Sequence, residues 1–503
     1  MSRPDFHVTA DDARALAASA RVCGRPMLRR VHDRATGSEE VVPIPCGSTR
    51  EAVCPACARK ARIIRIQQCT EGWHLSDEPD RPSRTSSNDG EDQDYEDDEG
   101  DGPGSKRVRS TKRRQNLPDL PKLRMSDRTV GQVFTTPSGK QYRPSMFATC
   151  TLPSYGAVLP SGAPKHPGSY DYRRAALDAL HFSKLCGRLW SNLRRCAGFN
   201  VQYFSVIEAQ KRGAPHLHAT IRGAIPRAIF RQVVAATDYA LWWPPFDQVL
   251  YDNDRLPEWT GPEHGYADPD TGEVLPTWQQ ALDALDADPA ARPAHVVRFG
   301  TQLDLQGVIP EHADRAVRYL AKYLTKAIGE THSNPDDHVY ARHLDRLHAE
   351  LRFLPCSPRC ANWLRYGVQP DYTKPGLNPG QCRMRGHDRD NLGVTRRVLP
   401  SRLWSGKTVD QHKADRAEVV RETLLSAGID APDLDRMAAS VTLPDGTPRF
   451  VWTDTRPDHD TYVAVVLNSI GERQRWRAQY EHAKATAAAL AGVAEVSTVA
   501  QPP

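Results

Sequence analysis

The stretch FSVIEAQKRGAPHLHAT, residues 204–220, decides the fold of this chain. Apolar and polar residues alternate on both sides of a short connection rich in turn-forming residues. This pattern predicts a hairpin of two strands, over residues 200–210 and 216–223. Alternate side chains of a strand project from the same face, so His216 and His218 should share one face while Leu217 occupies the other.

Two imidazoles on one strand face can bind a single divalent ion and leave room for a third protein ligand and for substrate oxygens. Glu208 and Gln210 lie on the preceding strand, which the hairpin brings alongside, and either can be the third ligand. We favour Glu208, because a carboxylate offsets the charge of the metal. A pair of exposed strand histidines without a metal is the simpler alternative.

The elements around this hairpin predict an α+β fold. Residues 145–153, SMFATCTLP, form a strand that ends at a proline, and residues 170–198 form a long amphipathic helix. Residues 295–304, HVVRFGTQLD, are predicted to form one further strand, and residues 312–329 a further helix.

The helix at 312–329 contains RYLAKYLTK, in which Tyr319 and Tyr323 alternate with Lys322 and Lys326. Both tyrosines lie off the apolar stripe of the helix and border its cationic face. A phenol with a pKa near 10 is a weak nucleophile, but lysines and a metal-polarised phosphate both help it to react. Residues four apart share a helix face about 6 Å apart along the axis, which suits two nucleophiles that attack one DNA phosphate in turn.

Cysteine spacing indicates a zinc site near the start of the chain. Cys23, Cys46, Cys54 and Cys57 follow the pattern C-x22-C-x7-C-x2-C, in which the last pair resembles the knuckle of a zinc ribbon. Cys69 is near enough in sequence to be a rival ligand. Unrelated cysteines that share no metal are the alternative.

A second zinc site is predicted from Cys356, Cys360, Cys382 and His387, spaced C-x3-C-x21-C-x4-H. Four protein ligands leave no open position on Zn²⁺, so both sites should be structural. The other cysteines, at positions 150, 186 and 196, are expected to be buried thiols.

The charge of the chain is strongly segregated. Residues 77–101 contain twelve acidic residues and two arginines, and the basic cluster KRVRSTKRR follows at 106–114. The acidic stretch carries −10 within a total of +5, so the rest of the chain carries +15. That balance indicates a polyanionic partner, with a solubilising surface as the alternative. The stretch and the cluster together predict a disordered linker.

Three motifs carry a family resemblance. APHLHAT resembles the His-hydrophobic-His motif of the HUH endonuclease superfamily, and YLAKYLTK resembles the two-tyrosine motif of its replication-initiator branch. FATCTLPSYG is similar to the first motif of that branch, and the three motifs occur in the order that initiators have. The chain most resembles rolling-circle replication initiators of actinobacterial plasmids and integrative elements, over most of residues 20–415.

The resemblance implies a role for each matching residue. His216 and His218, with Glu208, would hold Mg²⁺ or Mn²⁺. Either tyrosine would be a nucleophile that leaves a 5′-phosphotyrosine and a free 3′-OH to prime synthesis, and the two lysines would position the phosphate. The fold implied is the RRM-like antiparallel sheet of HUH nucleases with flanking helices, plus two small zinc-binding modules and a mixed C-terminal region.

These observations predict five regions: an N-terminal zinc-ribbon-like module (1–75), an acidic and basic linker (76–115), the nuclease domain (116–335), a second zinc-binding module (336–400) and a basic, helical C-terminal accessory region (401–503).

The expected partners are the double-stranded origin, the single-stranded nick site and the host replication machinery. SRLWSGKT (401–408) lacks the first glycine of a phosphate loop, so unwinding would need a host helicase. A homodimer is left open. The chain has no run of about 18 apolar residues, so we expect a cytoplasmic protein without a membrane partner. A two-tyrosine transposase and a noncatalytic zinc-ribbon regulator are the alternatives to a replication initiator.

Overall fold

The computed structural model describes most of the chain in two compact units. The described residues are 8–73, 145–197, 199–252, 255–308, 316–321, 337–426 and 441–499, with single positions between 75 and 142. One unit comprises residues 69–406, and the other joins residues 1–68 to residues 407–503. Helices and antiparallel sheets occur together, which confirms the predicted α+β class. The acidic and basic stretches lie outside the described residues, apart from Pro79.

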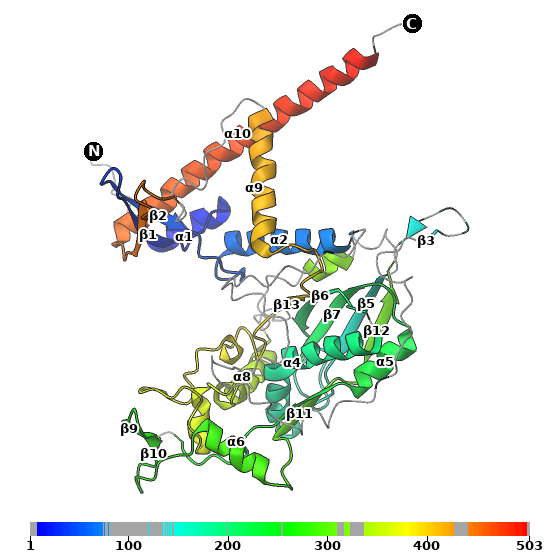
Figure 1. Ribbon diagram of the computed structural model, residues 1–503, viewed down its shortest axis with the longest axis vertical. Coiled ribbons are helices and arrows are strands. Elements are labelled where there is room, and N and C mark those ends of the chain that lie inside the picture. The colour runs from blue at the N-terminus through cyan, green and yellow to red at the C-terminus, as the bar shows by residue number, and fades with distance from the viewer. Residues whose placement is uncertain are drawn as a thin grey trace. The chain divides into compact units, whose positions relative to one another are not determined.

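The unit of residues 69–406 is built on a five-stranded sheet in which every neighbouring pair is antiparallel (Figure 1). The predicted hairpin supplies its centre, and the strand predicted at 145–153 lies beside it. In spatial order the strands are β12 (Leu303–Gly307), β5 (Ser145–Thr151), β7 (Pro215–Arg222), β6 (Tyr203–Ala209) and β13 (Val398–Pro400).

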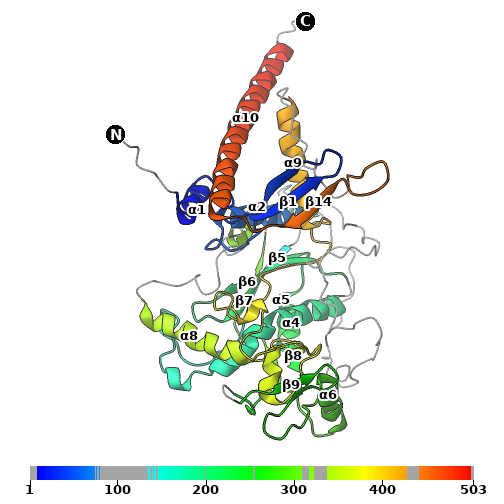
Figure 2. The ribbon, with the colours of Figure 1, turned by 90° about the vertical axis from the view of Figure 1, so that its left-hand side faces the viewer.

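A long helix, α4 (Tyr172–Ala197), covers one face of this sheet (Figures 1 and 2). Ile207 and Leu217 point toward it from paired positions on β6 and β7, and both are fully buried. Trp190 of α4 stacks on Tyr203 with ring centroids 3.7 Å apart. The apolar side chains of the hairpin therefore pack against α4, and the histidines lie on the other face of the sheet.

The strand predicted at 295–304 is wrong as a single element, because the chain breaks near Gly300. β11 (His295–Arg298) pairs with β8 (Asp238–Leu241), while β12 joins the five-stranded sheet. The Gly300 amide donates to the carbonyl of Thr151 at 2.7 Å. A Cβ at this position would lie 2.9 Å from the carbonyl oxygen of Leu152, so only glycine allows the two backbones to approach this closely.

The remaining elements of this unit are short. They are β3 (Phe134–Thr135), β4 (Gln141–Tyr142), η1 (Pro167–Ser169), α5 (Arg227–Ala236), β9 (Glu258–Gly261), β10 (Gly265–Ala267), α6 (Trp278–Ala287), α8 (His338–Phe353), η2 (Ala361–Tyr366) and η3 (Arg385–His387). Of the helix predicted at 312–329, residues 316–321 are described and helical.

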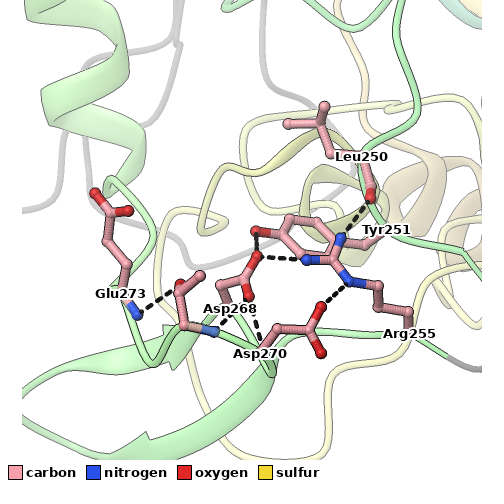
Figure 3. A network of polar contacts seen from close by, with 7 residues as sticks. Leu250, Tyr251, Arg255, Asp268, Asp270 and Glu273 are labelled. Carbon is pink, nitrogen blue, oxygen red and sulfur yellow. Dashed lines mark hydrogen bonds and ion pairs between the residues drawn. The ribbon is translucent and has the colours of Figure 1, made fainter.

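A polar network connects residues 250–252 with residues 255–273 (Figure 3). The Arg255 guanidinium contacts the carboxylates of Asp268 and Asp270, at 3.0 and 2.5 Å. Tyr251 donates its hydroxyl hydrogen to Asp268 at 2.8 Å. Backbone amides at Asp270 and Thr271 also donate to Asp268, and these bonds lower the pKa of its carboxyl to about 2.

In the other unit, segments from the two ends of the sequence form one sheet. β1 (Met27–Asp33) pairs with β2 (Glu39–Ile44) on one side and with β14 (Phe450–Asp454) on the other. The helices are α1 (Ala10–Ser19), α9 (Val409–Ser426), α10 (His459–Val499) and α2 (Pro55–Trp73), of which residues 69–73 belong to the unit of residues 69–406. No local pattern predicts the pairing of β1 with β14, because the paired residues are more than 400 positions apart.

The compact units group the chain differently from the five predicted regions. Segments of the ranges 1–75 and 401–503 share one sheet, and α8 of the range 336–400 packs on α4. β13, which ends the range 336–400, is an edge strand of the five-stranded sheet. None of the helices in the described ranges is long and apolar enough to cross a membrane.

Asp33 and Arg449 form a bidentate ion pair, with N–O distances of 2.8 and 2.9 Å, beside the β1–β14 junction. The Arg449 guanidinium holds the pKa of Asp33 well below its usual range. A carboxyl group with a depressed pKa stabilises the fold at pH values above its unfolded pKa of about 3.9, and this stabilisation is lost as the pH falls below that value.

Asp33→Asn should therefore lower the melting temperature at pH 7, and the difference from wild type should shrink below about pH 4.

Circular dichroism melts between pH 3 and 7 would measure this difference. Asp454→Asn is the matched control, because Asp454 pairs with Arg29 on the same sheet but its side chain is 85% exposed. Equal melting temperatures for wild type and Asp33→Asn at pH 7 would contradict the expectation.

Candidate active site

The register of the central hairpin places three polar side chains on one face of the sheet. Glu208 of β6 pairs directly with His216 of β7, and His218 follows two residues along β7. The turn that sets this register closes with the Gln210 amide donating to the Ala214 carbonyl at 2.8 Å, and Gly213 has a φ of +77°. Few residues other than glycine adopt this left-handed conformation.

The three side chains converge on a common point. The Nε2 atoms of His216 and His218 are 2.6 Å apart. Glu208 Oε2 lies 3.0 Å from Nε2 of His218 and 3.7 Å from Nε2 of His216. All three residues are buried, so the donors meet where water screens charge weakly.

Thr149 fixes the orientation of one imidazole. It pairs with His218 across β5 and β7, and its Oγ1 lies 2.9 Å from His218 Nδ1. When Nδ1 carries the proton and donates it to Thr149, Nε2 presents its lone pair to the point that the other donors share. Metal-binding histidines are commonly held in this way by a partner on the second ring nitrogen.

The structure distinguishes the two candidates for third ligand. Glu208 reaches the histidines, whereas Gln210 Oε1 accepts a hydrogen bond from Arg212 Nε at 2.9 Å. The same guanidinium donates to the carbonyls of Leu152 and Pro153, at 2.8 and 2.6 Å. Gln210 therefore belongs to the network that fastens the hairpin tip to the end of β5.

Tyr319 lies against the histidines, on the short described part of its helix. Its ring centroid is 5.2 Å from that of His218 and 5.9 Å from that of Phe147, both in edge-to-face contact. The side chain is 41% exposed, so one side of the phenol is open to solvent. Tyr323, Lys322 and Lys326 lie outside the described residues.

The donor set fits a divalent ion. Two imidazoles and a carboxylate from adjacent strands occupy one side of an ion and leave the other side open for water or substrate oxygens. An ion held there would lie beside an exposed phenol, on a rigid sheet whose opposite face is the core. The arrangement can therefore bring a metal-bound phosphate and a tyrosine together.

The second cysteine group is brought together at the end of α8. Cys356, Cys360, Cys382 and His387 place their ligand atoms within 4.8 Å of one another. His387 Nδ1 lies 2.7 Å from the Leu351 carbonyl, which turns Nε2 toward the thiols, 3.6 Å from Cys360 Sγ. Hydrogen bonds between the thiols raise the pKa of Cys356 and lower that of Cys382.

The first cysteine group is also assembled, in the other unit. Cys23, Cys46, Cys54 and Cys57 lie within the same 4.8 Å limit, and the Cys46 amide donates to Cys23 Sγ at 3.3 Å. The rival ligand, Cys69, belongs to the unit of residues 69–406, where it is buried, and burial raises the pKa of its thiol. The cysteines at 150, 186 and 196 are buried.

Sequence reasoning missed Phe147 and Thr149, which line the histidine face. A signal was present, because Phe147, Thr149 and Thr151 occupy alternate positions of the strand predicted at 145–153. It also missed a buried network, in which Asp178 of α4 accepts from Tyr155 at 2.8 Å and contacts His295 at 2.7 Å. No local pattern marks a network drawn from three distant segments.

Comparison with known proteins gives one family. The profile of the family described as "Replication initiator protein, pSAM2" (RepSA) matches residues 9–489. A "Replication initiator protein" of Streptomyces ambofaciens is 30% identical over 278 residues, which cover 45% of this chain and 54% of that protein. The chain thus spans about half the length of this curated relative. No solved structure matches the chain.

Removal of one of the three ligands, Glu208, His216 or His218, should abolish tight binding of a divalent ion. We expect Glu208→Gln and His216→Ala to weaken Mn²⁺ binding at least roughly tenfold, because each removes one of three ligands. Titration followed by electron paramagnetic resonance would measure free Mn²⁺. Gln210→Ala is the control and should bind as wild type does. Equal affinity for wild type and Glu208→Gln would exclude this carboxylate as a ligand.

Each cysteine group should hold one zinc ion. Elemental analysis of the purified protein is expected to give two zinc ions per chain, and one after either Cys54→Ser or Cys360→Ser. Cys360→Ser should also lower the melting temperature, since its group packs into the main core. Cys186→Ser is the control for loss of a buried thiol. A zinc content unchanged by Cys360→Ser would contradict the assignment of that site.

Proposed function

The chain belongs to the RepSA family of replication initiator proteins, and from this premise we propose that it nicks and rejoins single-stranded origin DNA through a tyrosine. The observation that carries the proposal is the edge-to-face contact of Tyr319 with His218. A nucleophile and a metal-ligand set on one sheet face are the two parts that such a reaction requires. The resemblance of the three sequence motifs to HUH endonucleases points to the same chemistry.

In the proposed reaction, Glu208, His216 and His218 hold Mg²⁺ or Mn²⁺, which supplies Lewis-acid polarisation of the scissile phosphate. The Tyr319 oxygen attacks phosphorus as its phenol loses a proton. The bond from phosphorus to the 3′ oxygen breaks, and that oxygen takes up a proton. The products are a 5′-phosphotyrosine and a free 3′-OH, which can prime synthesis.

The positions of Thr149, His218 and Tyr319 explain why a tyrosine can act as the nucleophile. Thr149 holds the His218 ring in place, so the ring edge against Tyr319 is a fixed contact. The phenol is exposed, so a DNA strand can reach it without unfolding the sheet. The reverse attack, by a 3′-OH on the phosphotyrosine, uses the same geometry and rejoins the strand.

The proposal also includes Tyr323, Lys322 and Lys326, because of their spacing from Tyr319. A helix continued beyond residue 321 would put Tyr323 one turn from Tyr319, where it could attack a second phosphate after one round of replication. The two lysines would then contact phosphate oxygens. Membership in an initiator family favours replication over transposition, and a noncatalytic regulator would need no tyrosine beside the histidine site.

The proposed partners are DNA and the replication machinery of the host. The double-stranded origin and its exposed nick site would be bound largely through phosphate contacts, so affinity should fall steeply with salt. The two cysteine groups, each with Zn²⁺, would stabilise the surfaces that hold the DNA. A host helicase would unwind the duplex, and a second subunit could supply the second cleavage.

Formation of a covalent adduct between the protein and DNA tests the proposal. Purified protein would be incubated with Mn²⁺ and labelled single-stranded fragments that tile the replicating element, and then analysed on a denaturing gel. We expect an adduct from wild type and none from Tyr319→Phe with Tyr323→Phe. Each single variant would show which tyrosine attacks first. Glu208→Gln should also lose the adduct.

Tyr372→Phe is the control, because Tyr372 is a 63% exposed tyrosine of the same unit and should leave the yield unchanged. An adduct that survives loss of both tyrosines would overturn the proposed nucleophiles. Absence of any adduct with wild type across all fragments would overturn the proposed activity.

A further inference from the structure

A pocket of about 730 Å³ opens between the loop that precedes α4 and the first turns of α8. It lies entirely within the unit of residues 69–406 and contains none of the metal-site residues. Pockets of 300–1,000 Å³ are typical of small-ligand sites. The volume therefore suits one nucleotide rather than a folded partner.

One side of the pocket is apolar and aromatic. Tyr170 and Tyr172 lie 4.7 Å apart between ring centroids, and His343 packs edge-on against Tyr170 at 5.4 Å. Val339, the second residue of α8, is 45% exposed. The buried hydroxyl of Tyr170 has no hydrogen-bond partner among the described residues. Tyr170 and Tyr172 are both buried, so Val339 supplies most of the apolar surface that a planar ring could contact, with the tyrosines behind it.

The other side carries mixed charge with a cationic excess. Arg346 contacts Glu350 at 3.2 Å, and the Arg173 guanidinium donates to the Phe246 carbonyl. The Asp171 carboxylate accepts from a backbone amide of α4 at 3.0 Å. Arg342 is exposed and makes no ion pair in the described part of the chain.

Two helices also begin at this pocket. Tyr172 and Arg173 open α4, which is 26 residues long, and Val339 and Arg342 lie in the first turns of α8, which is 16 residues long. Helix N-termini carry partial positive charge and favour anions. Asp171 offsets part of this field at α4 and Asp337, which accepts from the Tyr340 amide, does so at α8, so Arg342 supplies most of the attraction.

The pocket wall is tied to the hairpin that carries the metal donors. His343 Nε2 lies 3.0 Å from the carbonyl of Arg212, and Arg212 is the residue that fastens the hairpin tip. Glu208 and His216 pair one step before that tip. His216 in β7 lies four positions after Arg212 in the turn, a span of at most about 13 Å at 3.3 Å per residue. The pocket and the metal donors thus lie at the same end of the sheet.

We propose that this pocket binds one nucleotide of the single strand that flanks the scissile phosphate, with its phosphate on Arg342 and its base against the wall of Tyr170, Tyr172 and Val339. The proposal rests on the proposed nicking function, since the strand that it binds is the one that Tyr319 would cut. Contact of a base with an aromatic or apolar surface beside a cation is a general mode of single-strand binding and needs no particular sequence.

The test uses the full chain without added divalent metal, so that binding is separated from cleavage. The probe is a fluorescein-labelled 30-nucleotide strand of thymidylate, followed by fluorescence anisotropy at several salt concentrations. Arg342→Glu is expected to weaken binding roughly three- to tenfold, and Arg342→Ala to lower the salt slope by about 0.7, the value for one phosphate contact on a single strand. Arg342→Lys should keep most of the affinity.

Arg231→Glu is the matched control, because Arg231 is exposed on α5 of the same unit and lies outside the pocket. Thymidine 3′,5′-bisphosphate should compete with the strand for wild type but not for Arg342→Glu. Inorganic phosphate and thymidine would each be tested separately as competitors. Competition by inorganic phosphate as strong as by the bisphosphate would reduce the site to an anion site and overturn the base contact.

The outcome separates this inference from the nicking function. Equal affinity for wild type and Arg342→Glu, or an equal loss with Arg231→Glu, would overturn the pocket while leaving the covalent adduct untouched. Loss of the adduct with the pocket effect retained would leave a single-strand binding site in a protein that does not nick.

Discussion

The register between β6 and β7 is the constraint on which the rest of this structure depends. Side chains alternate between faces along a strand, so a slip of one residue would turn both histidines into the core and bring Leu217 to the surface. Two sets of contacts oppose this change of register. Ile207 and Leu217 are packed against α4, and the Arg212 guanidinium ties the hairpin tip to two carbonyls at the end of β5.

The same register decides what surrounds the metal donors. β5 lies on the far side of β7, so Thr149 pairs with His218 and Phe147 lies on the same face, where both contact the histidine–tyrosine group. Gly300 lets the chain pass close to the end of β5 before β12 begins, and the helix with Tyr319 follows β12. The proposed nucleophile is thus held beside the sheet by its contacts with Phe147 and His218.

Local patterns in the sequence were enough to predict the central hairpin, the strand at 145–153, the helix at 170–198 and the common face of the two histidines. These features depend on alternation and helical periodicity, which neighbouring residues specify. The preference for Glu208 over Gln210 came from charge, and the geometry now shows Gln210 held by Arg212.

Other features depend on distant residues and could not be predicted in this way. The pairing of β1 with β14, the network around Asp178 and the break at Gly300 each require contacts between segments that no local pattern connects. Cysteine spacing was more informative, because zinc ligands recur at characteristic intervals. The structure assembles both predicted groups, although they are drawn from segments up to 35 residues long.

The central claim is that Glu208, His216 and His218 hold a divalent ion beside Tyr319. Diffraction from crystals grown with Mn²⁺, recorded at the manganese absorption edge, tests it most directly. We expect an anomalous peak about 2.0–2.5 Å from one atom of each of the three side chains, with the Tyr319 hydroxyl on the open side of the ion. A peak elsewhere, or a phenol turned away from the ion, would contradict it.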